Sequence, residues 1–227
     1  MEDPTHPAAQ ATEQAPAARP ASTTQPPPET SPDTLNLRAP IKHATPAALD
    51  AFLPPPTAWL QTTWTVTHSS LPMWKKAKNV RITYRQKQLN NGPIALLDTV
   101  ENTPIKKGWL PSMQKIEGVD YPYDREGKEI TVDGVDAAQW QWKGKGLLRL
   151  TGGSRWEVLG WGAEGPEKWV VTWFAASLFT PAGIDVYSSR REGINENLYA
   201  KIEKGLKELG VEEVTKLANA MFPVMID

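Results

Sequence analysis

His68 is the side chain of this sequence best placed for acid–base chemistry. It ends a run of β-branched and aromatic residues, 62–68, whose composition predicts a β-strand. Side chains two positions apart share a face of a strand, so Trp64, Val66 and His68 would lie on one side. A histidine in a mostly apolar cavity can act as a general acid or base near neutral pH. A rim histidine, solvated or hydrogen-bonded locally, is the other interpretation.

Tyr84 is the second candidate. Residues 80–85 alternate strictly between apolar and polar side chains, which is typical of a half-buried strand. Ile82 and Tyr84 share its apolar face, and the Tyr84 hydroxyl would either contact a ligand or only pack. If the protein is an enzyme, His68 and Tyr84 are the expected catalytic residues.

Tryptophans are the third group, since the sequence has ten of them. Trp140 and Trp142 share one face of an expected strand, and whether they point inward or outward is open. Trp169, Val171 and Trp173 share a face of another strand, and we expect this face inward because the alternate positions are less coherent. Several indoles around one cavity would suit a flat or polycyclic ligand; simple core packing is the alternative.

Short strands at regular spacing would position these side chains. The expected segments are 62–68, 80–85, 94–100, 115–119, 138–143, 147–151, 156–161, 169–176 and 184–188. Most are separated by Gly or Pro, and this pattern predicts an all-β barrel or sandwich. The end of the chain, residues 194–222, is expected to be helical, with Asn195 as the cap of a first helix. Its apolar residues recur at helical spacing, which predicts a face packed on the barrel.

The chain divides into three parts by composition. Residues 1–35 are rich in Pro, Ala and Thr and lack aromatic residues, so they are expected to form a disordered tail. Residues 36–58 read as a linker with a possible short helix near 47–53, stopped by a run of three prolines. Residues 59–227 are expected to form the folded domain with its C-terminal helices.

Bulk composition narrows the function classes. A formal net charge of −1 without a basic block argues against nucleic-acid binding. The absence of cysteine excludes disulfides, thiolate catalysis and cysteine-ligated metals. Only three histidines are present, so we expect no metal and no cofactor. No apolar run reaches the roughly 20 residues of a membrane helix, and no secretory signal pattern is found, which predicts a cytoplasmic protein of undetermined oligomeric state.

Three motifs lie in an order that resembles the lipocalins of the calycin superfamily, over residues 61–217. Lipocalins open with Gly-x-Trp on the first strand, and residues 62–64 are Thr-Thr-Trp. Bacterial and plant-type members continue with Asn-Val-x-x-x-Tyr, and residues 79–84 are Asn-Val-Arg-Ile-Thr-Tyr. The family's last strand ends in Ser-Arg before a helix, as do Ser189 and Arg190 here. The family's middle Thr-Asp-Tyr motif is lost, and residues 167–169, Glu-Lys-Trp, stand at the corresponding place.

The resemblance implies an eight-stranded up-and-down barrel with one open mouth and room for one small ligand. It also implies that Trp64 lies at the closed end, with Arg190 packed across the indole as a cation–π pair. Both residues would then be structural; Arg191, one position further, is the competing register. Lipocalins are typically secreted and often disulfide-bonded, so the lack of both features puts extracellular transport in doubt.

Three functions are compatible with this sequence. The first is a carrier or sequestering protein for a small hydrophobic molecule. The second is a cofactor-free isomerase or cyclase of the pericyclase type, because some lipocalin-like barrels, for instance in fungal natural-product pathways, fold a flexible substrate in this way. The third is a structural interaction module with a solid interior. The expected ligand-binding residues are Val66, His68, Ile82, Tyr84, Trp140, Trp142, Trp169, Val171 and Trp173.

Overall fold

The computed structural model describes residues 35–89, 94–106, 113–131, 136–146, 153–178 and 180–227. The expected tail up to residue 34 and the expected strand at 147–151 lie outside these described residues.

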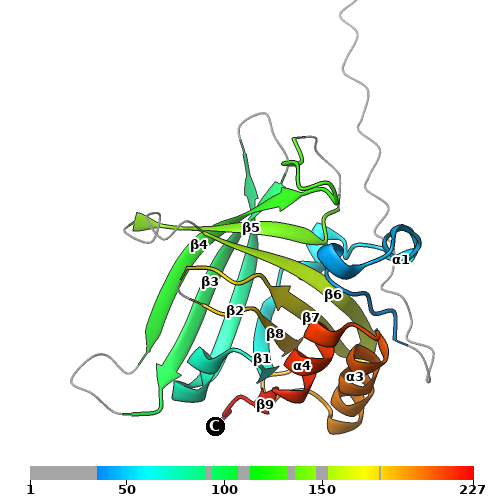
Figure 1. The fold of residues 1–227 in the computed structure, drawn as a ribbon. Helices are drawn as coiled ribbons and strands as arrows, with labels where there is room; N and C mark the ends of the chain where they lie inside the picture. The colour runs from blue at the N-terminus through cyan, green and yellow to red at the C-terminus, as the bar shows by residue number, and fades with distance from the viewer. Residues whose placement is uncertain (1–34, 90–93, 107–112, 132–135, 147–152, 179) are drawn as a thin grey trace, which may run out of the picture.

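The described part of the chain contains eight main strands, which form one closed antiparallel barrel (Figure 1). They span Thr63–Ser69 (β1), Ala77–Gln88 (β2), Ile94–Pro104 (β3), Gln114–Tyr123 (β4), Gln139–Gly144 (β5), Ser154–Glu164 (β6), Glu167–Phe174 (β7) and Gly183–Ser188 (β8). Each strand pairs with the next, and β1 pairs with both β2 and β8, which closes the sheet. A short ninth strand, β9 (Phe222–Pro223), pairs with β1. The predicted up-and-down barrel is confirmed.

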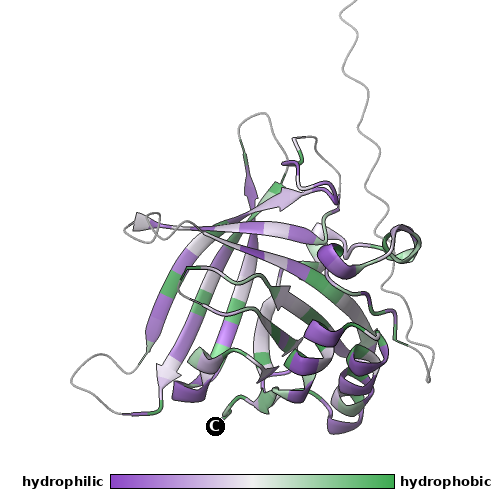
Figure 2. Cartoon of the chain, in the orientation of Figure 1, coloured by the Kyte–Doolittle hydropathy of each residue, from purple (hydrophilic) through white to green (hydrophobic). Residues whose placement is uncertain are grey.

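Side chains along the strands point alternately into the barrel and out of it, as strand geometry requires. Figure 2 shows the resulting alternation of hydrophobic and hydrophilic residues around the sheet. Two apolar clusters follow from it: one fills the barrel interior, and the other lies between the outer surface of β6–β8 and the C-terminal helices.

Trp64 lies at the closed end of the barrel, fully buried, as the lipocalin resemblance implies. Its Nε1 donates a hydrogen bond to the Leu60 carbonyl at 3.0 Å. Trp59 of the short helix α2 (Thr57–Leu60) covers it. The ring centroid of Trp59 lies 5.3 Å from that of Trp64 and 4.8 Å from that of Trp161. Three indoles therefore plug this end.

The expectation that Arg190 packs across Trp64 is wrong. Arg190 is 41% exposed and pairs with Glu192 (2.8 Å) and with Glu167 (3.7 Å). It follows the end of β8, where its own N–H donates to Ser188 Oγ at 3.0 Å. Because Trp59 already occupies the face of Trp64, the arginine is left to the surface turn.

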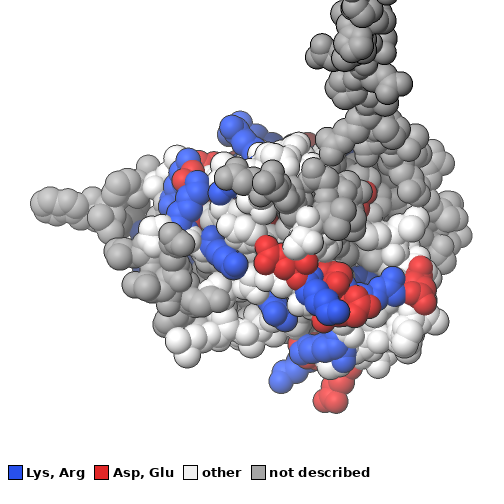
Figure 3. All heavy atoms as spheres, turned by 90° about the horizontal axis from the view of Figure 1, so that it is seen from above, with Lys and Arg blue, Asp and Glu red and all other residues white. Residues whose placement is uncertain are grey.

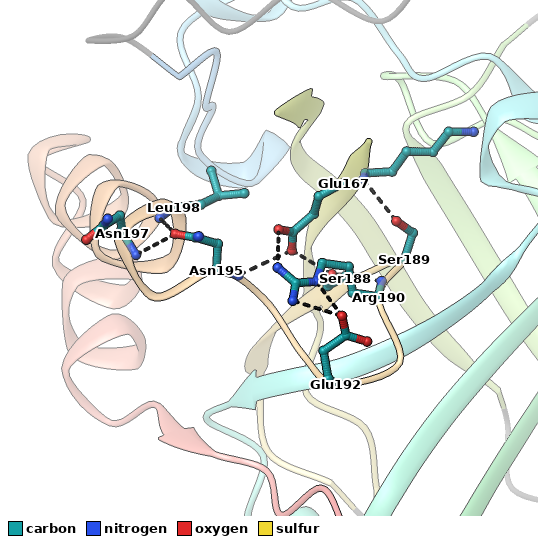
Figure 4. A network of polar contacts seen from close by, with 9 residues as sticks. Glu167, Ser188, Ser189, Arg190, Glu192, Asn195, Asn197 and Leu198 are labelled. Atoms are coloured by element: carbon teal, nitrogen blue, oxygen red, sulfur yellow. Dashed lines mark hydrogen bonds and ion pairs between the residues drawn. The ribbon is translucent and has the colours of Figure 1, made fainter. Parts of the chain in front are cut away.

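Glu167 is the centre of the polar network in Figure 4. Its buried Oε1 accepts hydrogen bonds from Ser188 Oγ at 2.7 Å and from the Asn195 N–H at 3.3 Å. Asn195 in turn caps the next helix, since its Oδ1 accepts from the N–H groups of Asn197 and Leu198. One carboxylate thus ties β7 and β8 to the start of α3, and the predicted cap is confirmed.

Two C-terminal helices, α3 (Glu196–Glu208) and α4 (Glu212–Asn219), cover the outside of β6–β8 (Figure 1). The predicted stripe of α3 is buried there, through Leu198, Ile202 and Leu206. Among the described residues, no helix is both long and apolar enough to cross a membrane.

The segment before the barrel runs along its outer surface. The N–H of Arg38 donates to the Leu159 carbonyl at 2.8 Å, and its buried guanidinium pairs with Glu157 at 2.9 Å. A 3₁₀ turn, η1 (Ile41–His43), and a short helix, α1 (Pro46–Ala51), follow, the latter near the expected 47–53. This segment leads into α2 and so delivers Trp59 to the closed end.

Candidate functional site

The barrel interior holds a cavity of about 340 Å³ on the opposite side from the Trp64 plug. Its apolar walls include Leu71, Trp74, Ile82, Val100, Ile116 and Phe174. Its polar groups are few and include Tyr84, Asp98, Asp185 and Tyr187. A mostly apolar hollow with a few convergent polar groups is typical of a small-molecule site.

A 3₁₀ segment between β1 and β2, η2 (Pro72–Lys76), covers part of the cavity. The indole of Trp74 lines the cavity, and its Nε1 donates to Asp185 Oδ2 at 3.2 Å. The other oxygen of Asp185 accepts from Ser69 Oγ at 2.5 Å. Asp185 therefore holds η2 and the end of β1 against β8.

Three aspartates from three strands point into this apolar interior: Asp98, Asp120 and Asp185. Burial raises the pKa of Asp98 and of Asp185 to about 7. Burial, reinforced by the neighbouring Asp98, raises the pKa of Asp120 well above its usual range. No Lys, Arg or His is among the described residues that line the cavity, so this part of the chain supplies no counter-charge there.

Asp98 and Asp120 are neighbours on the inner face of β3 and β4. Asp98 pairs with Gly118, and Asp120 lies two positions further along β4, so the two carboxyls are diagonal neighbours. Asp120 Oδ1 accepts from Trp156 Nε1 at 2.8 Å. Asp120 Oδ2 and Asp98 Oδ1 have no hydrogen-bond partner among the described residues.

Two tyrosines complete the polar wall. Tyr84 pairs with Asp98 across β2 and β3, and Tyr187 approaches from β8. Burial raises the pKa of both phenols well above the usual value, and the charges of the neighbouring carboxyls raise them further. Both hydroxyls are therefore neutral and able to donate a hydrogen bond.

Aromatic rings form a continuous group beside this wall. The ring of Trp156 stacks with Tyr84 (5.6 Å between centroids, 15° between planes) and with Trp140 (5.8 Å, 18°). Trp142 lies over Gly118, where an added Cβ would be only 2.1 Å from its Nε1. Whether Trp140 and Trp142 point inward or outward is thereby answered, since both face the barrel interior. Trp142 lines the cavity, and Trp140 packs in the interior cluster without lining it.

The expectation that Trp169, Val171 and Trp173 face inward is wrong. They belong to the outer cluster under α3 and α4. Both faces of β7 are buried, one in the barrel and one under helices, so its more apolar face is the one the helices cover. The alternate residues, including Phe174, face the interior.

The expectation that His68 lies in the cavity is also wrong. The pairing of β1 with β8 shifts register between Val66 and His68, and this bulge turns His68 outward. Its ring stacks on Tyr199 of α3, with 3.4 Å between ring centroids. Burial lowers the pKa of His68, partly offset by Glu196 and Glu203. The imidazole thus helps to dock α3 and takes no place in the cavity.

The remaining expected residues are inside the barrel. Ile82 and Tyr84 line the cavity, whereas Val66 is buried in the interior cluster without lining it. The three aspartates were missed. Their signal was Asp98 and Asp185 at inward positions of otherwise apolar strands, because aspartate is depleted in strands and costly in an interior.

The outer surface carries mixed charge. Figure 3 shows Lys and Arg next to Asp and Glu over one face of the molecule. Ion pairs such as Lys201 with Glu164 (3.0 Å) and Lys42 with Glu213 (2.5 Å) join segments on this outer surface. The buried aspartates therefore differ from the surface carboxylates in having no basic partner.

Comparison with known proteins yields no matching family model. A curated protein, "Botcinic acid biosynthesis cluster B protein 12" of Botryotinia fuckeliana, is 25% identical over 198 residues, covering 85% of this chain and 84% of that protein. Apocrustacyanin C1 (TM-score 0.48, 10% identity) and apocrustacyanin C2 (0.48, 11%) are similar over 74% of this chain and 78% of theirs. The siderocalin Ex-FABP (0.41, 13%) is similar over 74% of this chain and 94% of its own.

Proposed function

We propose that this protein binds a small, mainly apolar molecule inside its barrel and acts as a carrier or sequestering protein. The observation that carries the proposal is the cavity of about 340 Å³, whose walls are aromatic and aliphatic and whose polar groups gather on one side. A solid interior, as in a purely structural module, would leave no such space.

A second candidate is a cofactor-free isomerase or cyclase that uses the same cavity. Two observations favour it: the paired carboxyls of Asp98 and Asp120, and the similarity to a protein whose name assigns it to a biosynthesis cluster. Holding a flexible substrate in a reactive conformation can supply much of the rate enhancement of such a reaction. A protonated Asp98 beside it would polarise an oxygen of the substrate. His68, which faces α3, has no part in this mechanism.

The experiment titrates the full chain with a panel of fatty acids, polyketides and terpenoids. Quenching of tryptophan fluorescence measures binding. Trp74, Trp142 and Trp156 line the cavity, so an occupant should quench them. Chromatography with mass detection of each compound after incubation separates the two candidates: an unchanged retention time supports a carrier, and a new peak of equal mass supports the enzyme.

A matched pair of variants locates the binding. Val100 lines the cavity, whereas Thr99 is the next residue of β3 and points to the outer surface. Val100→Trp should fill the cavity and weaken binding at least about tenfold, while Thr99→Trp should leave it unchanged. Equal effects of the two variants, or quenching by no compound, would count against an internal binding site.

A further inference from the structure

The carboxyl wall restricts the kind of molecule that fits. We propose that the ligand carries a neutral oxygen acceptor, such as a ketone or lactone carbonyl, that accepts a hydrogen bond from the Asp98 carboxylic acid, with Asp120 as the positioning residue behind it. The inference rests on the proposed binding of a small molecule in the cavity.

Asp98 lies at the cavity wall and has an unused hydrogen-bonding atom. Its side chain lines the cavity and yet is only 7% exposed, and its Oδ1 has no hydrogen-bond partner among the described residues. A buried polar atom without a partner costs about 1–3 kcal/mol. Oδ1 itself is buried, so a ligand group reaches it when the carboxyl at the cavity wall rotates; a hydrogen bond formed there removes that cost, and Asp98 therefore marks where a polar part of the ligand belongs.

Burial is the main reason that Asp98 favours its neutral form, and a hydrogen bond from Trp142, which favours the charged form, only partly offsets it. The titratable groups that face it are Tyr84 from β2, Asp120 from β4 and Tyr187 from β8, with Asp185 beyond Tyr187. None of these carries a positive charge, and two neighbouring carboxyls in an apolar interior cannot both ionise easily. Burial raises the pKa of Asp98 to about 7, so below this pH the group is a donor.

Asp120 fixes the arrangement without reaching the cavity. Its Oδ1 accepts from Trp156 Nε1, so its proton belongs on Oδ2. The raised pKa of Asp120 keeps it protonated next to Asp98, which leaves Asp98 as the group that exchanges its proton near neutral pH. A hydrogen-bond donor at the wall of an apolar cavity selects an acceptor on an otherwise apolar molecule.

Three naphthalene probes of similar shape test the proposal by calorimetry on the full chain: 2-acetonaphthone with a carbonyl, 2-ethylnaphthalene without one, and 2-(aminomethyl)naphthalene with a cation. At pH 5.5 the ketone should bind about threefold to tenfold more tightly than the ethyl compound, the value of one net hydrogen bond. At pH 8.5, where Asp98 is ionised, this advantage should disappear.

Two substitutions at Asp98 separate donation from titration. Asp98→Leu removes the donor, so the ketone should lose its advantage at every pH. Asp98→Asn keeps an N–H donor that does not titrate, so the advantage should persist and become independent of pH. Asp50→Asn, at an exposed carboxylate paired with Arg125, is the control that should change neither. Thermal unfolding of each variant checks that it folds.

The outcomes distinguish this proposal from the proposed function. Binding of the ketone and the ethyl compound with equal affinity at both pH values would overturn the acceptor and leave the binding cavity intact. Tightest binding of the amine, strengthening from pH 5.5 to 8.5, would overturn it in favour of a cationic ligand. If no probe binds, the proposed function falls, and the inference falls with it.

Discussion

At the scale of single residues, the unusual feature is a set of buried acids that no basic side chain of the described residues neutralises. Asp185 donates nothing but accepts from Ser69 and Trp74, so its role is to hold η2 over the cavity. Asp98 and Asp120 each leave an oxygen without a partner among the described residues. The same interior thus contains one structural carboxyl, Asp185, one at the cavity wall that is available to a ligand, Asp98, and one behind it, Asp120.

The Asp98 carboxyl should make stability depend on pH. Its pKa in the folded protein, about 7, is higher than the 3.8 of an ordinary aspartate, so the folded state holds a proton that the unfolded chain releases. The stabilisation that this bound proton gives the folded state is complete below about pH 4 and is lost as the pH rises to about 7. Asp98→Asn should therefore match the parent at pH 4 and exceed it at pH 8.5 by up to about 4 kcal/mol, as measured by urea unfolding.

Asp50→Asn, the same substitution at an exposed carboxylate outside the barrel, serves as the control. A stability difference between Asp98→Asn and the parent that is the same at pH 4 and pH 8.5 would show that Asp98 titrates normally.

At the scale of elements, Gly118 of β4 is what allows Trp142 to lie across the inner face of the barrel. An added Cβ would be 2.1 Å from Trp142 Nε1, so the indole would have to move. Gly118→Ala should cost about 1–3 kcal/mol of stability and weaken the binding of 2-ethylnaphthalene, because Trp142 lines the cavity.

A double-mutant cycle checks this cause. Trp142→Ala removes the indole that the new Cβ at position 118 would meet. Adding Gly118→Ala to this variant should therefore cause almost no further loss of stability. Additive losses of stability in the double variant would mean that Gly118 matters for a reason unrelated to Trp142.

The closed end gives a second prediction for elements. Trp59 covers Trp64 and Trp161, so Trp59→Ala should cost about 3–5 kcal/mol. Arg190 is largely at the surface, and Glu167 keeps its hydrogen bonds from Ser188 and Asn195 without it, so Arg190→Ala should cost far less stability than Trp59→Ala. Urea unfolding of both variants measures the contrast, and a larger loss for Arg190→Ala would restore the role implied by the lipocalin resemblance.

Strand spacing was sufficient for an all-β barrel or sandwich, the lipocalin resemblance favoured the barrel, and the stripe of α3 predicted the helical cover. The sequence was not sufficient for the face of β7, since this strand is apolar on both sides and alternation has no polar side to mark the exterior. His68 was misplaced by a single bulge after Val66, which reverses the facing of the next residue and has no strong local signature. The site itself depends on which aspartates meet across strands, and only the register decides that.

At the scale of the whole molecule, buried acids and His68 act on stability in opposite directions. The raised pKa values of Asp98 and Asp185 lower stability as the pH rises from about 4 to about 7, and the raised pKa of Asp120 acts in the same direction. His68 has a lowered pKa, so its contribution to stability is lost as the pH falls below about 6.5. Glu213 also has a lowered pKa, and its contribution to stability is lost as the pH falls below about 4.5. The thermal midpoint, followed by circular dichroism, should peak on the acid side of neutrality, at about pH 5–6.

Closure of the barrel has a consequence for synthesis of the chain. The two strands that close it come from distant parts of the sequence: Thr67 of β1 donates to the Val186 carbonyl, 119 positions later. A ribosome must therefore release almost the whole domain before β1 can find its second neighbour, and until then β1 remains an edge open to foreign strands. Such high contact order is typical of slow folders, so a lower growth temperature, which weakens apolar association between incomplete chains, should increase the yield of monodisperse recombinant material.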